Sequence, residues 1–264
     1  MENLRDLLFS EKDGIATLTL NRARSMNSLT LELLKEINLA LKECRRRDDI
    51  RVVILTGAGN AFSSGANIFG FEEALRENRI KSLVEEMVIE VNNLVIAVRE
   101  ILKPVLAMVN GFAFGAALDL LQACDFIFAS KGAKFQVGFP RFGLIPDGGG
   151  TYFFSRKLGV QKANELIFAA EPISAQKAFD MGLVNSVCAD NEELRAKTME
   201  TALRLAKGSA AAFAMTKKLI NESTFKDLKE HLLREKNVQG ERCMSPDFGE
   251  GLRALIEKRE PDFE

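Results

Sequence analysis

FSSGANI at residues 62–68 and NGFAFGAALD at residues 110–119 are the two stretches that decide the fold and the chemistry of this chain. Each follows an apolar run typical of a buried strand, Val52–Thr56 and Val105–Val109, and each precedes a segment with helical character. Gly, Ala and Ser leave backbone N–H groups uncovered, and the start of a helix adds the positive end of its dipole. The pattern therefore predicts two strand–loop–helix junctions whose amides converge on one oxygen, which is the design of an oxyanion hole.

Backbone amides are the groups that matter in these loops, because an N–H binds an oxyanion whatever small side chain its residue carries. We expect the donors to be the backbone N–H groups of Ser64 and Ala116. Either loop alone favours a packing role, since Gly and Ala are common where helices cross strands. The presence of both loops, each directly after a strand, favours a binding site.

The composition limits the classes of protein to which this chain can belong. Of its 264 residues 47% are hydrophobic, which is enough for a substantial core, and the net charge is −1. Acidic and basic residues are well mixed without a basic stripe, so we expect no nucleic-acid partner. No apolar run reaches about 18 residues, so we expect no membrane span.

Cysteine and histidine are too scattered for a metal site or a nucleophilic triad. The four cysteines have no CxxC spacing and are typical of isolated reduced thiols, which favours a cytoplasmic location. His231 is the sole histidine, so no metal is expected and Ser-His-Asp or Cys-His catalysis is disfavoured. Acid–base chemistry near pH 7 therefore falls to carboxylates.

Strands and helices alternate in the first half of the chain, which predicts βαβ units, a mostly parallel sheet and hence an α/β fold. After Thr151 the pattern is nearly all helical, and Val184–Val187 is the one interruption typical of a strand. No linker rich in Pro, Gly or Ser separates the two parts. We therefore expect residues 1–200 to form the core and residues 201–264 to form a helical C-terminal region docked on it.

Two carboxylates are candidates for acid–base catalysis. Asp119 lies one turn after Ala116 between two leucines, where it is either a site carboxylate or a hydrogen-bonded structural one. Asp147 lies in GLIPDGGGT at residues 143–151. An Asp before Gly is often only a turn residue, but the apolar approach to Asp147 indicates partial burial. Burial raises the pKa of a carboxyl and makes it a better base near pH 7.

These stretches resemble the crotonase, or enoyl-CoA hydratase/isomerase, superfamily over nearly the whole chain. The motifs that carry the resemblance are LNR at 20–22, VILTG at 53–57, AFSSGA at 61–66, VNG at 109–111, CD at 124–125, GLIP at 143–146 and GLV at 182–184. The resemblance implies a crotonase-like spiral of ββα units with a helical C-terminal trimerisation region, assembled as a homotrimer or as a hexamer of two trimers. It also implies an acyl-CoA substrate and no cofactor, because CoA is part of the substrate.

The resemblance also assigns roles to residues. It places the oxyanion donors at Ser64 and Ala116, in agreement with the loop pattern. The residues that it predicts to bind CoA are Ser25, Met26, Ser28, Ala66, Asn67 and Ile68. Hydratases of the family use two glutamates. The first falls on Asp119, which is one methylene shorter, and the second falls on Phe139, whose phenyl ring cannot activate water.

Some isomerases of the family carry an acidic residue at the position of Asp147, and dienoyl-CoA isomerases also carry an Asp at the position of Asp119. The resemblance therefore favours an acyl-CoA isomerase that shifts a double bond through an enolate, with Asp147 as acid and base. Phe139 and Phe142 are expected to form an apolar acyl pocket. An enoyl-CoA hydratase with an atypical carboxylate set and a non-catalytic acyl-CoA-binding protein are the alternatives.

Overall fold

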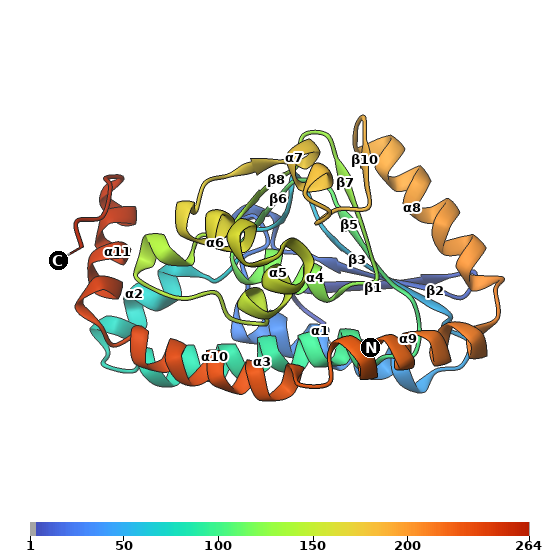
Figure 1. The fold of residues 1–264 in the computed structure, drawn as a ribbon, viewed down its shortest axis with the longest axis horizontal. Coiled ribbons are helices and arrows are strands. Elements are labelled where there is room, and N and C mark those ends of the chain that lie inside the picture. The colour runs from blue at the N-terminus through green and yellow to red at the C-terminus, as the bar shows by residue number, and fades with distance from the viewer. Residues whose placement is uncertain (1–3, 264) are drawn as a thin grey trace.

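Two β-sheets form the centre of the structure, a computed structural model that describes residues 4–263 (Figure 1). The larger sheet has the strand order β1-β2-β3-β5-β7-β10, and the smaller sheet has the order β4-β6-β8-β9. The strands of the larger sheet are β1 (Leu7–Lys12), β2 (Ile15–Leu20), β3 (Val52–Gly57), β5 (Val105–Val109), β7 (Phe126–Ser130) and β10 (Ser186–Cys188). The strands of the smaller sheet are β4 (Ala61–Ser63), β6 (Phe112–Phe114), β8 (Lys134–Gln136) and β9 (Ile173–Ser174).

A repeated unit of one long strand, one short strand and a helical segment links the two sheets. β3 is followed by β4, β5 by β6 and β7 by β8, and in each pair the first strand lies in the larger sheet and the second in the smaller one. The strands from β2 to β10 in the larger sheet pair in parallel, and so do β4, β6 and β8. The α/β fold built of ββα units that the sequence predicts is therefore confirmed.

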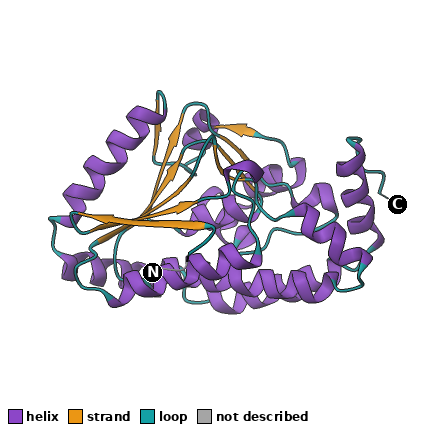
Figure 2. Ribbon diagram, turned by 180° about the vertical axis from the view of Figure 1, so that it is seen from behind, coloured by secondary structure: helices purple, strands orange, loops and turns teal. Residues whose placement is uncertain are grey.

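Helices cover both faces of the larger sheet. The α-helices are α1 (Leu31–Arg46), α2 (Ile68–Arg76), α3 (Ile80–Glu100), α4 (Ala116–Ala123), α5 (Gly150–Leu158), α6 (Val160–Ala169), α7 (Ala175–Asp180), α8 (Asn191–Ala206), α9 (Ala210–Thr224), α10 (Leu228–Arg242) and α11 (Pro246–Glu257), and two short 3₁₀ turns are η1 (Ala23–Ser25) and η2 (Phe139–Phe142). α1 and α3 pack together on one side of the sheet, and α8 lies on the other (Figures 1 and 2).

β3 shows why the central strands are apolar throughout. Val53 and Leu55 point into the larger core on the side of α1 and α3, whereas Val52 and Ile54 point into a second core with Leu194 of α8. Side chains alternate between the two faces of a strand, so a strand that is covered on both faces must be apolar at every position.

The C-terminal region consists of α9, α10 and α11, and α10 runs alongside α3 (Figures 1 and 2). α8 spans residue 200, where the sequence predicts the end of the core, and it packs against β3, β5 and β7. Within the described part of the chain, no helix combines the length and the apolar character needed to cross a membrane.

Candidate active site

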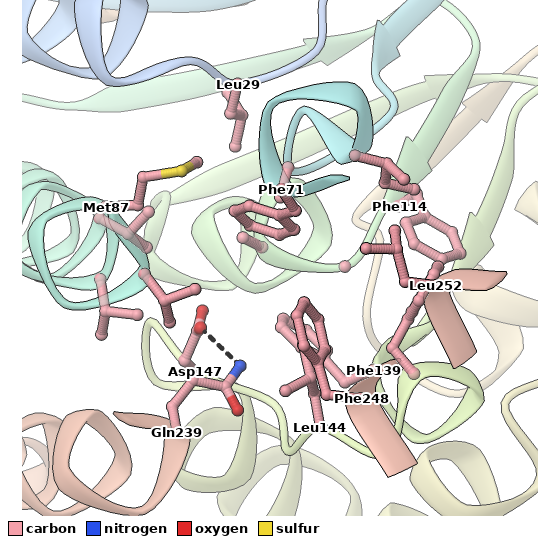
Figure 3. Close-up of a pocket in the computed structure, with 18 residues that line it drawn as sticks. Leu29, Phe71, Met87, Phe114, Phe139, Leu144, Asp147, Gln239, Phe248 and Leu252 are labelled. Carbon is pink, nitrogen blue, oxygen red and sulfur yellow. Dashed lines mark hydrogen bonds between the residues drawn. The ribbon is translucent and has the colours of Figure 1, made fainter. Parts of the chain in front are cut away.

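A cavity lies where the loops after β4 and β6 meet α3, α10, η2 and α11 (Figure 3). Its lining is apolar apart from Asp147 and Gln239, whose side chains are hydrogen-bonded to each other. The other lining residues are Leu29, Ala66, Ile68, Phe71, Val84, Met87, Val88, Val91, Phe114, Gly115, Ala116, Phe139, Phe142, Leu144, Phe248 and Leu252. An apolar cavity with a few converging polar groups is typical of a ligand-binding site.

The two glycine-containing loops enter this cavity side by side. β4 and β6 pair in parallel with Ser63 opposite Ala113, so the loops that follow them leave the same edge of the smaller sheet. Gly65 has φ +74° and Gly115 has φ +53°, which are conformations that favour glycine. A Cβ atom on Gly65 would lie 2.6 Å from the carbonyl oxygen of Phe114, so the close approach of the loops also requires glycine.

The N–H groups of Ala66 and Ala116 are the amides that these loops offer to the cavity. Ala116 is the first residue of α4, where an N–H has no acceptor inside its own helix. Neither amide has a hydrogen-bond acceptor within residues 4–263, and both residues line the cavity. This pair is therefore available to bind a carbonyl oxygen.

Ser64 is a correction to the sequence prediction. Its N–H donates to the carbonyl oxygen of Met26 at 2.9 Å, and Ser64 is not among the residues that line the cavity. The positive φ of Gly65 turns the chain after Ser64, so the next free amide belongs to Ala66. The prediction of Ser64 as an oxyanion donor is therefore wrong, and the free N–H of this loop belongs to Ala66, which the sequence predicts as a CoA-binding residue.

The residues predicted to bind CoA lie next to one another beside the cavity. The Ser64 hydroxyl donates to the carbonyl oxygen of Ser25, and the Ser28 hydroxyl donates to the Ser25 hydroxyl at 3.0 Å. Met26 is half exposed at φ +51°, between these serines. The turn at Ser25–Ser28 thus packs directly against the loop that carries Ala66, so these predicted residues belong to one surface.

Asn67 and Ile68 continue that surface into α2. Asn67 is the residue before the helix, and its N–H donates to the carbonyl oxygen of Leu29 at 3.1 Å. Its side chain makes no capping hydrogen bond, and Ile68 lines the cavity. CoA binding by this group of residues stays a prediction.

Asp147 is both a turn residue and a buried carboxyl, the two possibilities that its sequence context leaves open. Its carbonyl oxygen accepts from the N–H of Gly150 at 3.1 Å, so it is a turn residue, and its side chain is only 5% exposed. Oδ2 accepts from Nε2 of Gln239 at 3.0 Å, and Oδ1 has no partner among residues 4–263. Burial and the nearby Glu235 charge raise the pKa of Asp147 to about 7, against the opposing effect of the Gln239 hydrogen bond. This carboxyl is therefore suited to act as a base near neutral pH.

Asp119 lies behind the cavity and not in its lining. It is fully buried, and neither carboxyl oxygen has a partner within the described residues. A Cβ atom on Gly150 would lie 2.8 Å from its Cγ, so this carboxyl sits directly against the Gly150 backbone. Burial, followed by the charges of Asp147 and Glu235, raises the pKa of Asp119 well above its usual range. Asp119 is therefore a buried carboxyl without a hydrogen-bond partner among the described residues, and neither reading taken from the sequence describes it fully.

Phe139 and Phe142 line the cavity where the sequence places an acyl pocket, and α11 adds Phe248 and Leu252 to the same lining. Phe248 lies on the same side of the cavity as Phe139 (Figure 3). A Cβ atom on Gly251 would lie 2.5 Å from Cα of Phe142, which shows how closely α11 approaches η2. Sequence reasoning missed these α11 residues, and it also missed Gln239 on α10.

The buried Asp147 predicts an unusual pH dependence of stability. Since the folded chain retains a proton on Asp147 up to about pH 7 and the unfolded chain loses it near pH 3.8, the free energy of unfolding falls as the pH rises between these values. A tenfold difference in proton affinity is about 1.4 kcal/mol, so the loss is roughly 4 kcal/mol at pH 8. Asp147→Asn is expected to remove this contribution and to be more stable than the wild type at pH 8. Urea denaturation of both proteins at pH 4.5 and pH 8 measures this difference in the free energy of unfolding. An equal change of the free energy of unfolding with pH in the two proteins would contradict the prediction.

Three comparisons with known proteins give consistent results. A family model described as Enoyl-CoA hydratase/isomerase matches residues 10–264. The trans-2-decenoyl-acyl-carrier-protein isomerase of Streptococcus mutans is 31% identical over 261 residues and covers 99% of this chain and 98% of that protein. A probable enoyl-CoA hydratase of Rhodobacter capsulatus is 37% identical over 255 residues and covers 95% of each. A solved structure of an enoyl-CoA hydratase from Mycobacterium avium subsp. paratuberculosis K-10 has a TM-score of 0.89 at 34% identity and covers 99% of this chain and 100% of that chain.

Proposed function

Because the chain belongs to the enoyl-CoA hydratase/isomerase family, we propose that it is an isomerase that moves a double bond along the acyl group of a thioester. The observation that supports this choice is the cavity, in which Asp147 is the one acidic side chain of the described residues and the surroundings are apolar apart from Gln239. One carboxylate in an apolar cavity suits proton transfer between two carbons. Hydration needs a further polar group that holds and activates water.

In this mechanism the thioester oxygen accepts hydrogen bonds from the N–H groups of Ala66 and Ala116, which acidifies the carbon next to the carbonyl or its vinylogous position. Asp147 removes a proton through Oδ1, and the electron pair of the broken C–H bond forms the enolate. Asp147 then returns the proton two or more carbons away, so the double bond moves without gain or loss of atoms. The apolar walls keep water away from the enolate.

Two features make the alternative functions less favourable. Hydration by Asp119 would require an ionised carboxylate that reaches the cavity, whereas Asp119 is fully buried and outside the lining, and its burial raises its pKa well above the usual range. A protein that only binds acyl-CoA would gain nothing from Asp147, a buried carboxyl that costs stability above pH 7 and has one oxygen without a partner in the described part of the chain.

The carrier of the acyl group and the assembly belong to the same proposal. The Rhodobacter relative is named for a CoA thioester and the Streptococcus relative for an acyl-carrier-protein thioester. We propose an acyl-CoA substrate whose CoA lies along Ser25–Ser28 and Ala66–Ile68, and a homotrimer or a hexamer of two trimers.

The test is an assay in H₂¹⁸O with 3-enoyl-CoA, dienoyl-CoA and 2-enoyl-CoA substrates, followed by mass spectrometry. We expect conversion of 3-enoyl-CoA or dienoyl-CoA to a product of unchanged mass, because isomerisation adds no atoms. A 3-hydroxyacyl-CoA that carries ¹⁸O would instead establish a hydratase, and tight binding without turnover would establish a binding protein. The same acyl groups on acyl-carrier protein show which carrier the protein prefers.

A further inference from the structure

α10 presents two buried polar side chains to the loop that carries Asp147. Glu235 and Gln239 are 3% and 2% exposed. They are four residues apart, so they project from the same face of the helix, one turn from each other. No pattern of apolar or charged residues in the sequence distinguishes them from the rest of α10, and the proton transfer proposed above does not use them.

Gln239 binds the loop through its whole amide group. Nε2 donates to Oδ2 of Asp147 at 3.0 Å and to the carbonyl oxygen of Ile145 at 3.0 Å, while Oε1 accepts from the N–H of Ile145 at 3.1 Å. Both hydrogen-bonding groups of Ile145 and one oxygen of Asp147 are thereby held by a single side chain. Gln239 also lines the cavity beside Asp147 (Figure 3).

Glu235 binds the other end of the same loop. Its carboxylate accepts from the N–H of Gly149 at 2.7 Å, from the N–H of Thr151 at 3.1 Å and from the Thr151 hydroxyl. The Thr151 hydroxyl is also 2.7 Å from Nε2 of His231, one turn earlier on α10. Glu235 therefore fixes the start of α5, which begins three residues after Asp147.

We propose that Glu235 and Gln239 are positioning residues of the active site, which hold the carboxyl group of Asp147 at the edge of the cavity from the two ends of its loop. This inference rests on the proposed role of Asp147 as the base. It extends that role, because it makes α10 of the C-terminal region a part of the active site.

The loop needs such contacts because its own sequence does not hold it. Gly148 has φ +60° and Gly149 has φ +88°, and Gly150 follows them, so three successive residues lack a side chain. On the side of α3, the apolar side chains of Val91 and Val95 lie next to the Gly148 position. A catalytic group that is displaced by about 1 Å loses on the order of 10²-fold in rate, so contacts that fix such a loop have a large effect on turnover.

The two positioning residues change the pKa of Asp147 in opposite directions. The Gln239 hydrogen bond stabilises the ionised carboxylate and lowers the pKa of Asp147, whereas the charge of Glu235 raises it. The remaining titratable groups of this cluster are Asp119 from α4, whose pKa burial raises well above its usual range, and His231, which reaches the cluster through Thr151. We therefore expect the removal of Gln239 and the removal of Glu235 to shift the pKa of Asp147 in opposite directions. A merely structural role of these residues would not produce opposite shifts.

The experiment titrates Asp147 in the full-length protein without substrate. ¹³C-carboxyl aspartate NMR follows the titration, and Asp147→Asn identifies its resonance. Gln239→Met keeps the length of the side chain and removes the amide, and we expect Asp147 to titrate about one pH unit higher. Glu235→Gln removes the charge, and we expect Asp147 to titrate about one pH unit lower. Asn237→Met makes the same amide-to-thioether change on the exposed face of α10 and should reproduce the wild-type curve.

Turnover supplies the second readout. We expect kcat of Gln239→Met to fall at least about 10-fold with a smaller change in KM, because the loss affects the orientation of the base and not substrate binding. Unshifted titrations, or shifts of the same sign in both variants, would overturn the positioning proposal and leave the isomerase proposal intact. Wild-type turnover in Asp147→Asn would overturn the assignment of Asp147 as the base, while opposite shifts would still support α10 as the support of this loop. Should Glu235→Gln not fold, Gln239→Met decides the question alone, because it leaves the start of α5 untouched.

Discussion

Asp147→Asn is expected to lower kcat for double-bond migration by about 10²–10⁴-fold, the usual contribution of a general base, with a much smaller effect on KM. Asn has nearly the same shape, and its carbonyl oxygen can still accept the hydrogen bond from Gln239. It cannot take up a proton, so only the chemical step is affected. Steady-state kinetics on a 3-enoyl thioester measure the loss. In the wild type, kcat/KM should rise with pH through about 7, as Asp147 loses its proton.

Asp119→Asn is the matched control for this prediction. It makes the same chemical change in the same cluster of buried carboxyls, at a residue whose pKa is raised well above its usual range by burial and which does not line the cavity. We therefore expect a smaller loss of kcat than in Asp147→Asn. Near-normal turnover in Asp147→Asn would remove this residue as the base, and a larger loss in Asp119→Asn would transfer the role to Asp119.

The arrangement of the two loops was predictable from sequence because it depends on local patterns. Apolar strand residues, small loop residues and a following helix identify the junctions after β3 and β5, and the structure brings them to one cavity. The short strands β4 and β6 inside these stretches were not predictable, since three residues are too few to show alternation. The sequence also does not show which of several consecutive amides faces inward. The φ angle of Gly65 decides between Ser64 and Ala66.

The rest of the site depends on contacts between distant segments. Gln239 binds a residue that lies 92 positions earlier in the sequence, and Glu235 binds one 86 positions earlier. In sequence both are ordinary helix residues, and their burial against the Asp147 loop follows only from the packing of α10. The burial of Asp147 was partly predictable, because the GLIP stretch before it is apolar, whereas the full burial of Asp119 follows from the Gly150 backbone that closes over it.

Ala116→Pro is expected to lower kcat by about 10²–10³-fold, the usual effect of removing one donor from an oxyanion hole. Proline has no N–H, so the substitution deletes the amide that Ala116 offers to the thioester oxygen. Ala116 is the first residue of α4, where proline is well tolerated because its N–H has no acceptor in the helix and the fixed φ of proline suits this position. The fold should therefore survive, and thermal unfolding compared with the wild type verifies this.

Ala116→Val separates the lost hydrogen bond from simple crowding of the cavity. Valine adds two carbons to alanine, as proline does, but it retains the N–H. If the amide of Ala116 stabilises the enolate, the valine variant should keep most of its kcat, and the proline variant should lose about 3 kcal/mol of transition-state stabilisation relative to it. Equal losses in the two variants would show that the added volume is responsible, and the enolate would then need another source of stabilisation. A selective loss in the proline variant would tie the rate to one backbone N–H, at the start of the helix that the NGFAFGAALD stretch encodes.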